Sequence, residues 1–213
     1  MEWSRGDSKA QFLWIEGPGT DVTDSERSIS MVAARLVASA SLAEVPVISY
    51  FCELLRSVQL QYYPASFPEE QAAVALASAL IRQTVEVLLP KFDTNFDLSR
   101  PRFEQLNGTF QSWDVSMEVL ADLLSLVPGT AFCVIDGIHW LDSQRADKYL
   151  RAFVEVLRNS TMKIMFTTSG RSGCLLEEIP VSETIQVMRM PAIGTQSLTE
   201  HLILEQFRKR RDL

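Results

Sequence analysis

The sequence predicts an α/β fold in which helices cover both faces of a five-stranded, mostly parallel sheet. Five short runs are almost continuously apolar, at residues 12–15, 47–51, 131–135, 164–167 and 184–188. Strands of a parallel sheet that is buried on both faces have this pattern, whereas strands with one solvated face alternate apolar and polar residues. Helical patterns lie between the runs, and strands that alternate with helices are typical of a doubly wound sheet.

The helices are predicted from apolar residues at helical spacing. The first has the apolar face Ile29, Val32, Ala33, Leu36 and Ala40. The second begins at a capping box of residues 66–69, with Pro68 in its first turn, and continues to Leu89, where Pro90 ends it. Two more have the faces Met117, Leu120, Ala121, Leu124 and Tyr149, Phe153, Val154, Leu157. A last helix is predicted to be capped by Ser197.

The composition predicts one globular domain, residues 1–213, with a long polar loop at about 91–113. A net charge of −7 argues against broad binding to nucleic acid or to an anionic membrane. The basic run 208–211 is expected to be a solvated helix end. The three cysteines do not have the spacing of a metal site, and they are predicted to be buried thiols. The sequence has no secretory signal and no apolar run as long as a membrane span, so we expect a cytoplasmic protein.

Three segments place chemistry-bearing residues where strands end. The run "FLWIEGPG" leads from a strand into Gly17-Pro18-Gly19, and "AFCVIDGIHWLD" ends a buried strand at Asp136. The run "KIMFTTSGRSG" ends a third strand at hydroxyl side chains, followed by Arg171. Ligands of open α/β sheets bind at the carboxyl ends of the strands, so these residues are predicted to share one edge of the sheet.

The phrases "LWIEGP", "VPVISYFCEL", "FCVIDGIHWLD" and "FTTSGRSG" resemble the nucleotide-binding domain of fungal NACHT-like proteins, which are signal-transducing P-loop ATPases of the STAND type. The resemblance extends from Phe12 to about Met188 and implies a P-loop NTPase-like three-layer α/β/α sandwich with the first strand central. It also implies that Asp136 holds Mg²⁺ and that Arg171 reaches a γ-phosphate. Such ATPases usually carry further domains, so protein partners or missing flanking domains are expected.

The phosphate loop departs from the family pattern. A working loop reads G-x-x-x-x-G-K-[ST], in which the lysine neutralises phosphate and the hydroxyl binds Mg²⁺. Gly17 begins this pattern, and Gly19 lies within it, but the last three positions hold Val22, Thr23 and Asp24. The pair Arg27-Ser28 imitates the missing Lys-Ser only if part of the loop is an insertion. Nearby acids oppose a polyphosphate: Glu16, Asp21, Asp24 and Glu26.

The same segment predicts which groups take the place of the phosphate at the start of the helix. Residues 23–26 fit a capping box, in which Thr23 and Glu26 exchange hydrogen bonds at the start of a helix. The positive end of the helix dipole would meet phosphate in a working loop, but here it meets the protein's own carboxylates.

The second motif is altered as well. After Gly137 the family usually places an acidic residue that activates water, whereas this chain has His139 and Trp140. We interpret His139 as a structural histidine, with a role as a base left open, and Trp140 as a packing residue. Asp142 is predicted to be the N-cap of the next helix, which begins at Ser143.

The sequence therefore favours a NACHT-like domain that does not hydrolyse nucleotide and serves as a regulatory or scaffolding module, with no catalytic residue and no cofactor. The alternatives are a divergent Mg²⁺-dependent ATPase or GTPase, and a domain that binds ATP or ADP without turnover. The enzyme would use Arg27, Ser28, Asp136 and His139, and binding without turnover would use Asp136 and backbone amides. The candidate binding residues as a set are Gly17, Gly19, Arg27, Ser28, Asp136 and Arg171, with Asp136 as the metal ligand.

Overall fold

The computed structural model describes residues 10–19, 23–52, 67–88 and 95–187, and for residues 23–28 it describes the backbone alone. Five strands form one sheet in the order β2-β3-β4-β1-β5, and every neighbouring pair is parallel. The strands are β1 (Gln11–Gly17), β2 (Val47–Phe51), β3 (Phe132–Asp136), β4 (Lys163–Ser169) and β5 (Thr184–Gln186). Each overlaps one of the five apolar runs, so the strand predictions are confirmed.

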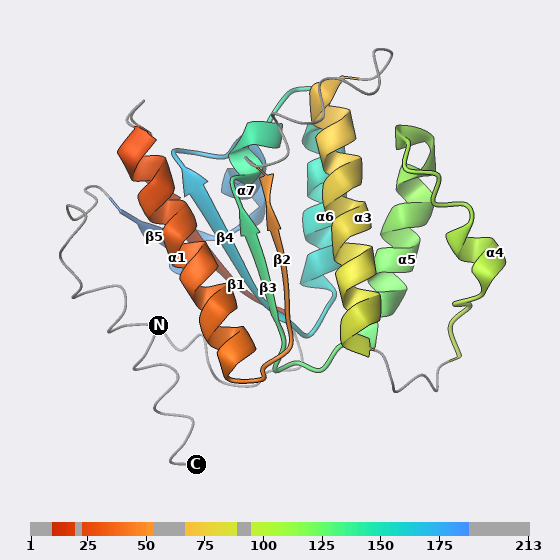
Figure 1. The fold of residues 1–213 in the computed structure, drawn as a ribbon. Coiled ribbons are helices and arrows are strands. Elements are labelled where there is room, and N and C mark those ends of the chain that lie inside the picture. The colour runs from red at the N-terminus through yellow and green to blue at the C-terminus, as the bar shows by residue number, and fades with distance from the viewer. Residues whose placement is uncertain (1–9, 20–22, 53–66, 89–94, 188–213) are drawn as a thin grey trace.

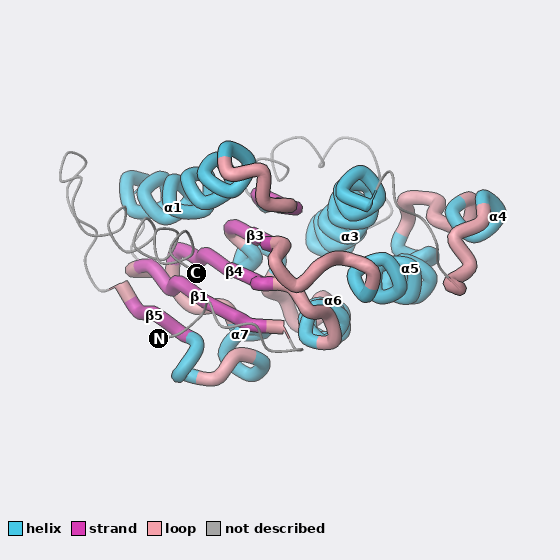
Figure 2. Tube along the Cα trace, turned by 90° about the horizontal axis from the view of Figure 1, so that it is seen from below, coloured by secondary structure: helices cyan, strands magenta, loops and turns pink. Residues whose placement is uncertain are grey.

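Helices cover both faces of this sheet, as Figures 1 and 2 show. Helix α1 (Thr23–Leu42) lies on one face and packs Ala33, Leu36 and Ala40 against Phe132, Val134 and Met165. On the opposite face lie α3 (Pro68–Leu88), α6 (Asp147–Arg158) and the short α7 (Gly173–Glu178), and α5 (Trp113–Ser125) packs against α3 and α6. The predicted three-layer α/β/α architecture is confirmed.

One implication of the family resemblance is wrong in detail. The middle strand is β4, and β1 lies one place away, between β4 and β5. Strand β4 lies between β1 and β3, and its first residue Lys163 pairs with Gln11 of β1 on one side and Phe132 of β3 on the other. The sheet is also entirely parallel in the described residues, where mostly parallel was predicted.

The helix predictions are largely confirmed. The predicted face of α1 is buried throughout, and Pro68 is the first residue of α3. The loop predicted at 91–113 contains more structure than expected: α4 (Arg100–Phe103) and a 3-10 helix (Phe110–Ser112) precede α5. Pro101 suits the first turn of α4, and the half-buried pair Arg102–Asp122 joins α4 to α5 with an N···O distance of 2.6 Å. The predictions for Ser66, Leu89, Pro90 and the helix at Ser197 lie outside the described residues.

The three thiols, Cys52, Cys133 and Cys174, are free and buried, as predicted. Burial raises the pKa of Cys133 to about 12. Within the described ranges, none of the helices has both the length and the apolar character needed to cross a membrane.

The outer edge of β2 is paired by a side chain. The Gln83 amide, on α3, donates a hydrogen bond to the Ser49 carbonyl and accepts one from the Ser49 N–H, each 2.8 Å long. Because an edge strand otherwise exposes its backbone groups, this amide takes the place that another strand would fill.

Candidate functional site

Asp136 lies at the carboxyl edge of the sheet, at the end of β3, as predicted. Its side chain faces α1, and only 3% of the residue is exposed. Ser30 Oγ, on α1, donates a hydrogen bond of 2.6 Å to Asp136 Oδ2. Thr167 Oγ1, on the neighbouring strand β4, donates one of 2.5 Å to Asp136 Oδ1. Both carboxylate oxygens therefore accept a hydrogen bond from a hydroxyl group of the protein.

The turns that follow β1 and β4 contact each other through their backbones. The Gly170 N–H donates a 3.0 Å hydrogen bond to the Gly17 carbonyl. Gly170 has a φ of +92°, and a Cβ built there would lie 3.0 Å from the Gly19 Cα. Glycine is therefore needed at position 170, both for its left-handed conformation and for this close approach.

The space beside Gly17 is filled by α1. A Cβ built on Gly17 would lie 2.7 Å from Ile29 Cγ1 and 3.1 Å from the Thr168 carbonyl oxygen. Ile29 itself is buried, with 2% exposed. An apolar side chain of the protein thus occupies the immediate surroundings of the glycine that begins the phosphate-loop pattern.

Arg171 is paired with an acid of the same sheet edge. Its Nε lies 3.4 Å from Glu16 Oε1, while Glu16 Oε2 accepts a 3.0 Å hydrogen bond from the Gln186 amide. Successive strand residues point to opposite faces, and Ile15 packs on the α1 side while Trp14 packs on the other. Glu16 is therefore directed away from the α1 face, so the structure brings Arg171 to Glu16 and not to Asp136.

The prediction that Asp142 caps the following helix is wrong. Helix α6 begins at Asp147, and the turn before it is closed by Ser143 Oγ, which accepts a 3.1 Å hydrogen bond from the Ala146 N–H. Asp142 Oδ2 instead accepts a 2.8 Å hydrogen bond from the Gly173 N–H, at the start of α7. Burial raises the pKa of Asp142, and hydrogen bonds from Ser172 and from the Gly173 and Cys174 backbones oppose this rise.

His139 and Trp140 lie in a 3-10 helix, Ile138–Leu141, directly after Asp136. Their rings are 4.9 Å apart. Gly137 has a φ of +74°, and a Cβ built there would lie 3.1 Å from Trp140 Cδ1. The half-buried indole therefore packs over this turn, in agreement with the interpretation of Trp140 as a packing residue.

The structure adds two site residues that the sequence did not single out, Ser30 and Thr167. Glu16 was expected only as an acid that opposes phosphate, and the structure pairs it with Arg171. The alternation of β4 offered a signal for Thr167, because it places this hydroxyl on the same face as Asp136. The side chains of Arg27 and Ser28, two of the predicted binding residues, lie outside the described part. Among described side chains, no group of three or more His, Cys, Asp or Glu residues is arranged to hold a metal ion.

No protein-family model matches the sequence, and no curated protein matches it significantly. Among solved structures, the chain is similar to one titled "Structure of Drosophila ORC bound to DNA". The identity is 8%, the match covers 88% of this chain and 87% of the other, and the TM-score is 0.40. A similarity this distant carries no information about function.

Proposed function

We propose that this domain is a NACHT-like P-loop domain with a degenerate phosphate loop, acting as a non-hydrolysing regulatory or scaffolding module of a signalling protein. The observation that carries the proposal is the environment of Asp136, whose two oxygens accept hydrogen bonds from Ser30 and Thr167. Hydroxyl groups of the protein thus bind both carboxylate oxygens, and the Asp136 side chain is almost fully buried.

The surroundings of Gly17 support the same proposal. Ile29 fills the space next to this glycine, and residues 16–19 include no cation. Arg171, the cation expected to reach a phosphate, pairs with Glu16 on the other face of the sheet. A bound polyphosphate needs several positive or N–H groups that point to one place. In the described residues of this edge, the one cation expected to serve, Arg171, pairs with Glu16 instead.

The net charge of −7 favours partners that are proteins, in the cytoplasm, over nucleic acid or an anionic membrane. Flanking domains of the same signalling protein are the partners that fit this proposal.

A second candidate function is the binding of ATP or ADP with Mg²⁺, with slow hydrolysis or none. The Ser30–Asp136 pair favours it, because P-loop proteins place a hydroxyl of the helix after β1 beside this aspartate to hold Mg²⁺. In this function Gly17, Gly19, Arg27 and Ser28 would contact the phosphates.

Calorimetric titration with ATP and ADP, with and without Mg²⁺, together with a hydrolysis assay, separates the two candidates. We expect neither heat of binding nor turnover above background, in the wild type or in Asp136→Asn. The control is Asp114→Asn, which makes the same charge change at an exposed position of α5. Turnover that requires Mg²⁺ and is lost only in Asp136→Asn would overturn the proposal. Binding heat without turnover, weakened in Asp136→Asn, would establish the second candidate.

A further inference from the structure

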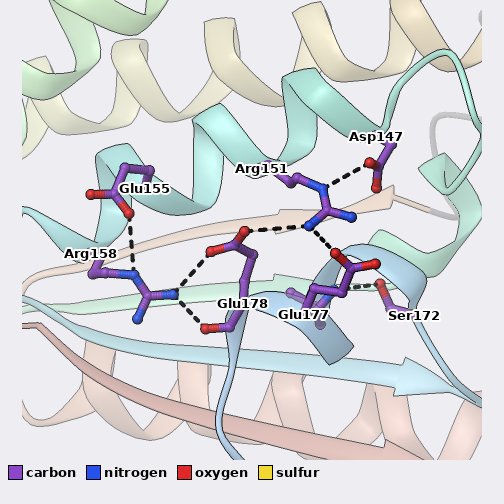
Figure 3. Close-up of polar contacts among 8 residues, drawn as sticks. Asp147, Arg151, Glu155, Arg158, Ser172, Glu177 and Glu178 are labelled. Carbon is purple, nitrogen blue, oxygen red and sulfur yellow. Dashed lines mark hydrogen bonds and ion pairs between the residues drawn. The ribbon is translucent and has the colours of Figure 1, made fainter.

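The two faces of β1 differ in how completely helices cover them. On the α7 side, Phe12 and Trp14 are buried in the main core, together with Cys174 and Leu175 of α7. Partly exposed ion pairs between the arginines of α6 and the glutamates of α7 lie outside this core, as Figure 3 shows. This face of β1 is therefore closed by helices of the described chain.

The α1 side of the same strands is only partly covered. Leu13 and Ile15 point to this side and are half-buried, at the edge of the cluster that α1 forms with β3 and β4. Ile185 pairs with Ile15 in register and so lies on the same face, where 39% of it is exposed. The Val187 N–H continues the ladder with a 2.8 Å hydrogen bond to the Glu16 carbonyl, and alternation places its half-buried side chain on this face too. Leu13, Ile15, Ile185 and Val187 form one apolar surface, the β1–β5 face.

Helix α1 covers the middle of the sheet and leaves this end open. It packs chiefly on β4, β3 and β2. A helix with its side chains is about 10 Å wide and neighbouring strands lie about 4.8 Å apart, so one helix covers roughly two strands. The opposite face of the sheet holds α3, α6 and α7. Because purely parallel sheets are covered on both faces, the β1–β5 face calls for a further helix beside α1.

The segment that follows β5 fits this place. Residues 188–213 come directly after Val187 and so start at the β1–β5 face itself. The sequence predicts a helix capped by Ser197 in this segment, and the run 198–207, LTEHLILEQF, has five apolar residues among its ten. These positions lie outside the described ranges. Ten helical residues span about 15 Å, which matches about five strand residues such as 13–17 of β1.

The charges agree with this placement. A helix that returns from the carboxyl end of β5 runs antiparallel to the parallel strands, as the crossover helix α1 does. Its end then lies beside the end of α1, whose last turn holds no basic residue and is followed by the exposed Glu44. The basic run 208–211 comes next in sequence and would meet the negative end of the α1 dipole.

We propose that residues 198–207 form a helix that packs on the β1–β5 face beside α1, with the basic run 208–211 against the carboxyl end of α1. The domain thereby completes its α1 layer with its own chain. This surface is then closed to partner proteins, and the proposal does not depend on whether the domain binds nucleotide.

The experiment measures the accessibility of the β1–β5 face in the full chain. Ile185→Cys places a thiol on this face, and Val181→Cys places one just before β5 at a position that is 88% exposed. Alkylation by iodoacetamide is followed at each thiol by peptide mass spectrometry, and the buried Cys133 reports whether the sheet stays folded. We expect the thiol at position 185 to react at least about tenfold more slowly than the thiol at position 181, at all protein concentrations.

A second substitution identifies the segment that covers the face. In the Ile185→Cys background, Leu202→Pro breaks the proposed helix and should raise the rate at position 185 about tenfold, with Cys133 still unreactive. Thr195→Pro, before the predicted cap at Ser197, is the matched control and should leave the rate unchanged. If Leu202→Pro also exposes Cys133, Leu202→Ala removes the apolar contact without breaking the helix and should still raise the rate.

Three results would overturn the proposal. The first is equal reactivity at positions 185 and 181, which means that nothing covers the face. The second is a slow rate at position 185 that neither substitution of Leu202 changes, which assigns the cover to another segment. The third is protection that disappears on dilution, which assigns it to a second copy of the chain.

Discussion

Ser30 Oγ donates a 2.6 Å hydrogen bond to Asp136 Oδ2 and so links the first helix to the end of β3, across 106 residues of sequence. The bond crosses between two layers of the sandwich and satisfies one oxygen of a buried carboxylate. The other oxygen of Asp136 accepts a hydrogen bond from Thr167, which belongs to the sheet itself. The carboxylate is thus part of the interior of the protein, whatever else it binds.

Replacing Ser30 with alanine should therefore destabilise the fold. A hydrogen bond to a charged group that is lost in a buried place costs about 1–3 kcal/mol in the free energy of unfolding. Urea denaturation measures this cost. Ser41→Ala, at an exposed position of the same helix, is the matched control and should stay within about 0.5 kcal/mol of the wild type. Equal effects of the two variants would show that the Ser30 bond contributes nothing.

A double-mutant cycle tests the contact between Gly17 and Ile29. Gly17→Ala places a methyl group against Ile29 Cγ1 and should cost about 1–3 kcal/mol. Ile29→Ala alone should cost about 2–5 kcal/mol, because it leaves a cavity. In the double variant the new methyl group enters this space, so the two costs should sum to more than the measured loss. Strict additivity would place Ile29 away from the glycine.

The capping box at residues 23–26 remains a prediction from the sequence, although α1 does begin at Thr23. Glu26→Ala should lower stability by about 1 kcal/mol, and Glu26→Lys by more, since a cation then faces the positive end of the helix. Thermal melting with and without Mg-ATP provides the measurement. A melting temperature that rises with Mg-ATP in the wild type would contradict a loop filled by its own carboxylates.

The Arg151–Glu177 pair predicts a specific titration. Its hydrogen bond and charge lower the pKa of Glu177. Because the folded-state pKa lies below the unfolded one, the stabilising effect is present above the unfolded pKa and is lost as the pH falls through the folded pKa. Carboxyl NMR titration should show the Glu177 pKa return to its usual range in Arg151→Ala. Glu183, whose pKa is raised by burial, should keep its shift in the same variant.

Gln83 offers a test of edge protection. Gln83→Ala removes both hydrogen bonds to Ser49 and should cost about 1–2 kcal/mol. It also leaves backbone groups of β2 open to pairing with another chain. Light scattering after size-exclusion chromatography should detect association that grows with concentration. Arg82→Ala, the exposed neighbour, should remain like the wild type in both measurements.

The strands could be predicted because burial on both faces makes their sequences continuously apolar. The predicted strands are too short where the real strand includes a polar residue. Strand β4 begins at Lys163, one residue before the predicted start, and this lysine is only 4% exposed. Its neighbours Gln11 and Phe132 come from two other strands, and no local pattern reveals that environment.

Asp136 could be placed for a similar reason, since the apolar run before it fixes the end of a buried strand. Its partner Ser30 could not, because a serine in a helix has no local signal that distinguishes a buried hydroxyl from a solvated one. The same holds for Asp142, which looks like an N-cap beside Ser143 but bonds to Gly173, far along the chain. Hydrogen bonds between residues so far apart in sequence depend on how the helices and the sheet pack together, and the spacing of residues along the chain does not reveal them.

The strand order also determines when the sheet can be completed during synthesis. β1 is the first strand to leave the ribosome, yet both of its neighbours, β4 and β5, are the last two. The Trp14 indole N–H of β1 donates its hydrogen bond to the Thr168 hydroxyl, which is synthesised 154 residues later. Contacts this distant in sequence slow folding and leave apolar segments exposed in the meantime. An apolar strand therefore stays unpaired until almost all of the sheet has been synthesised, so the tendency to aggregate during synthesis follows from the strand order of this domain.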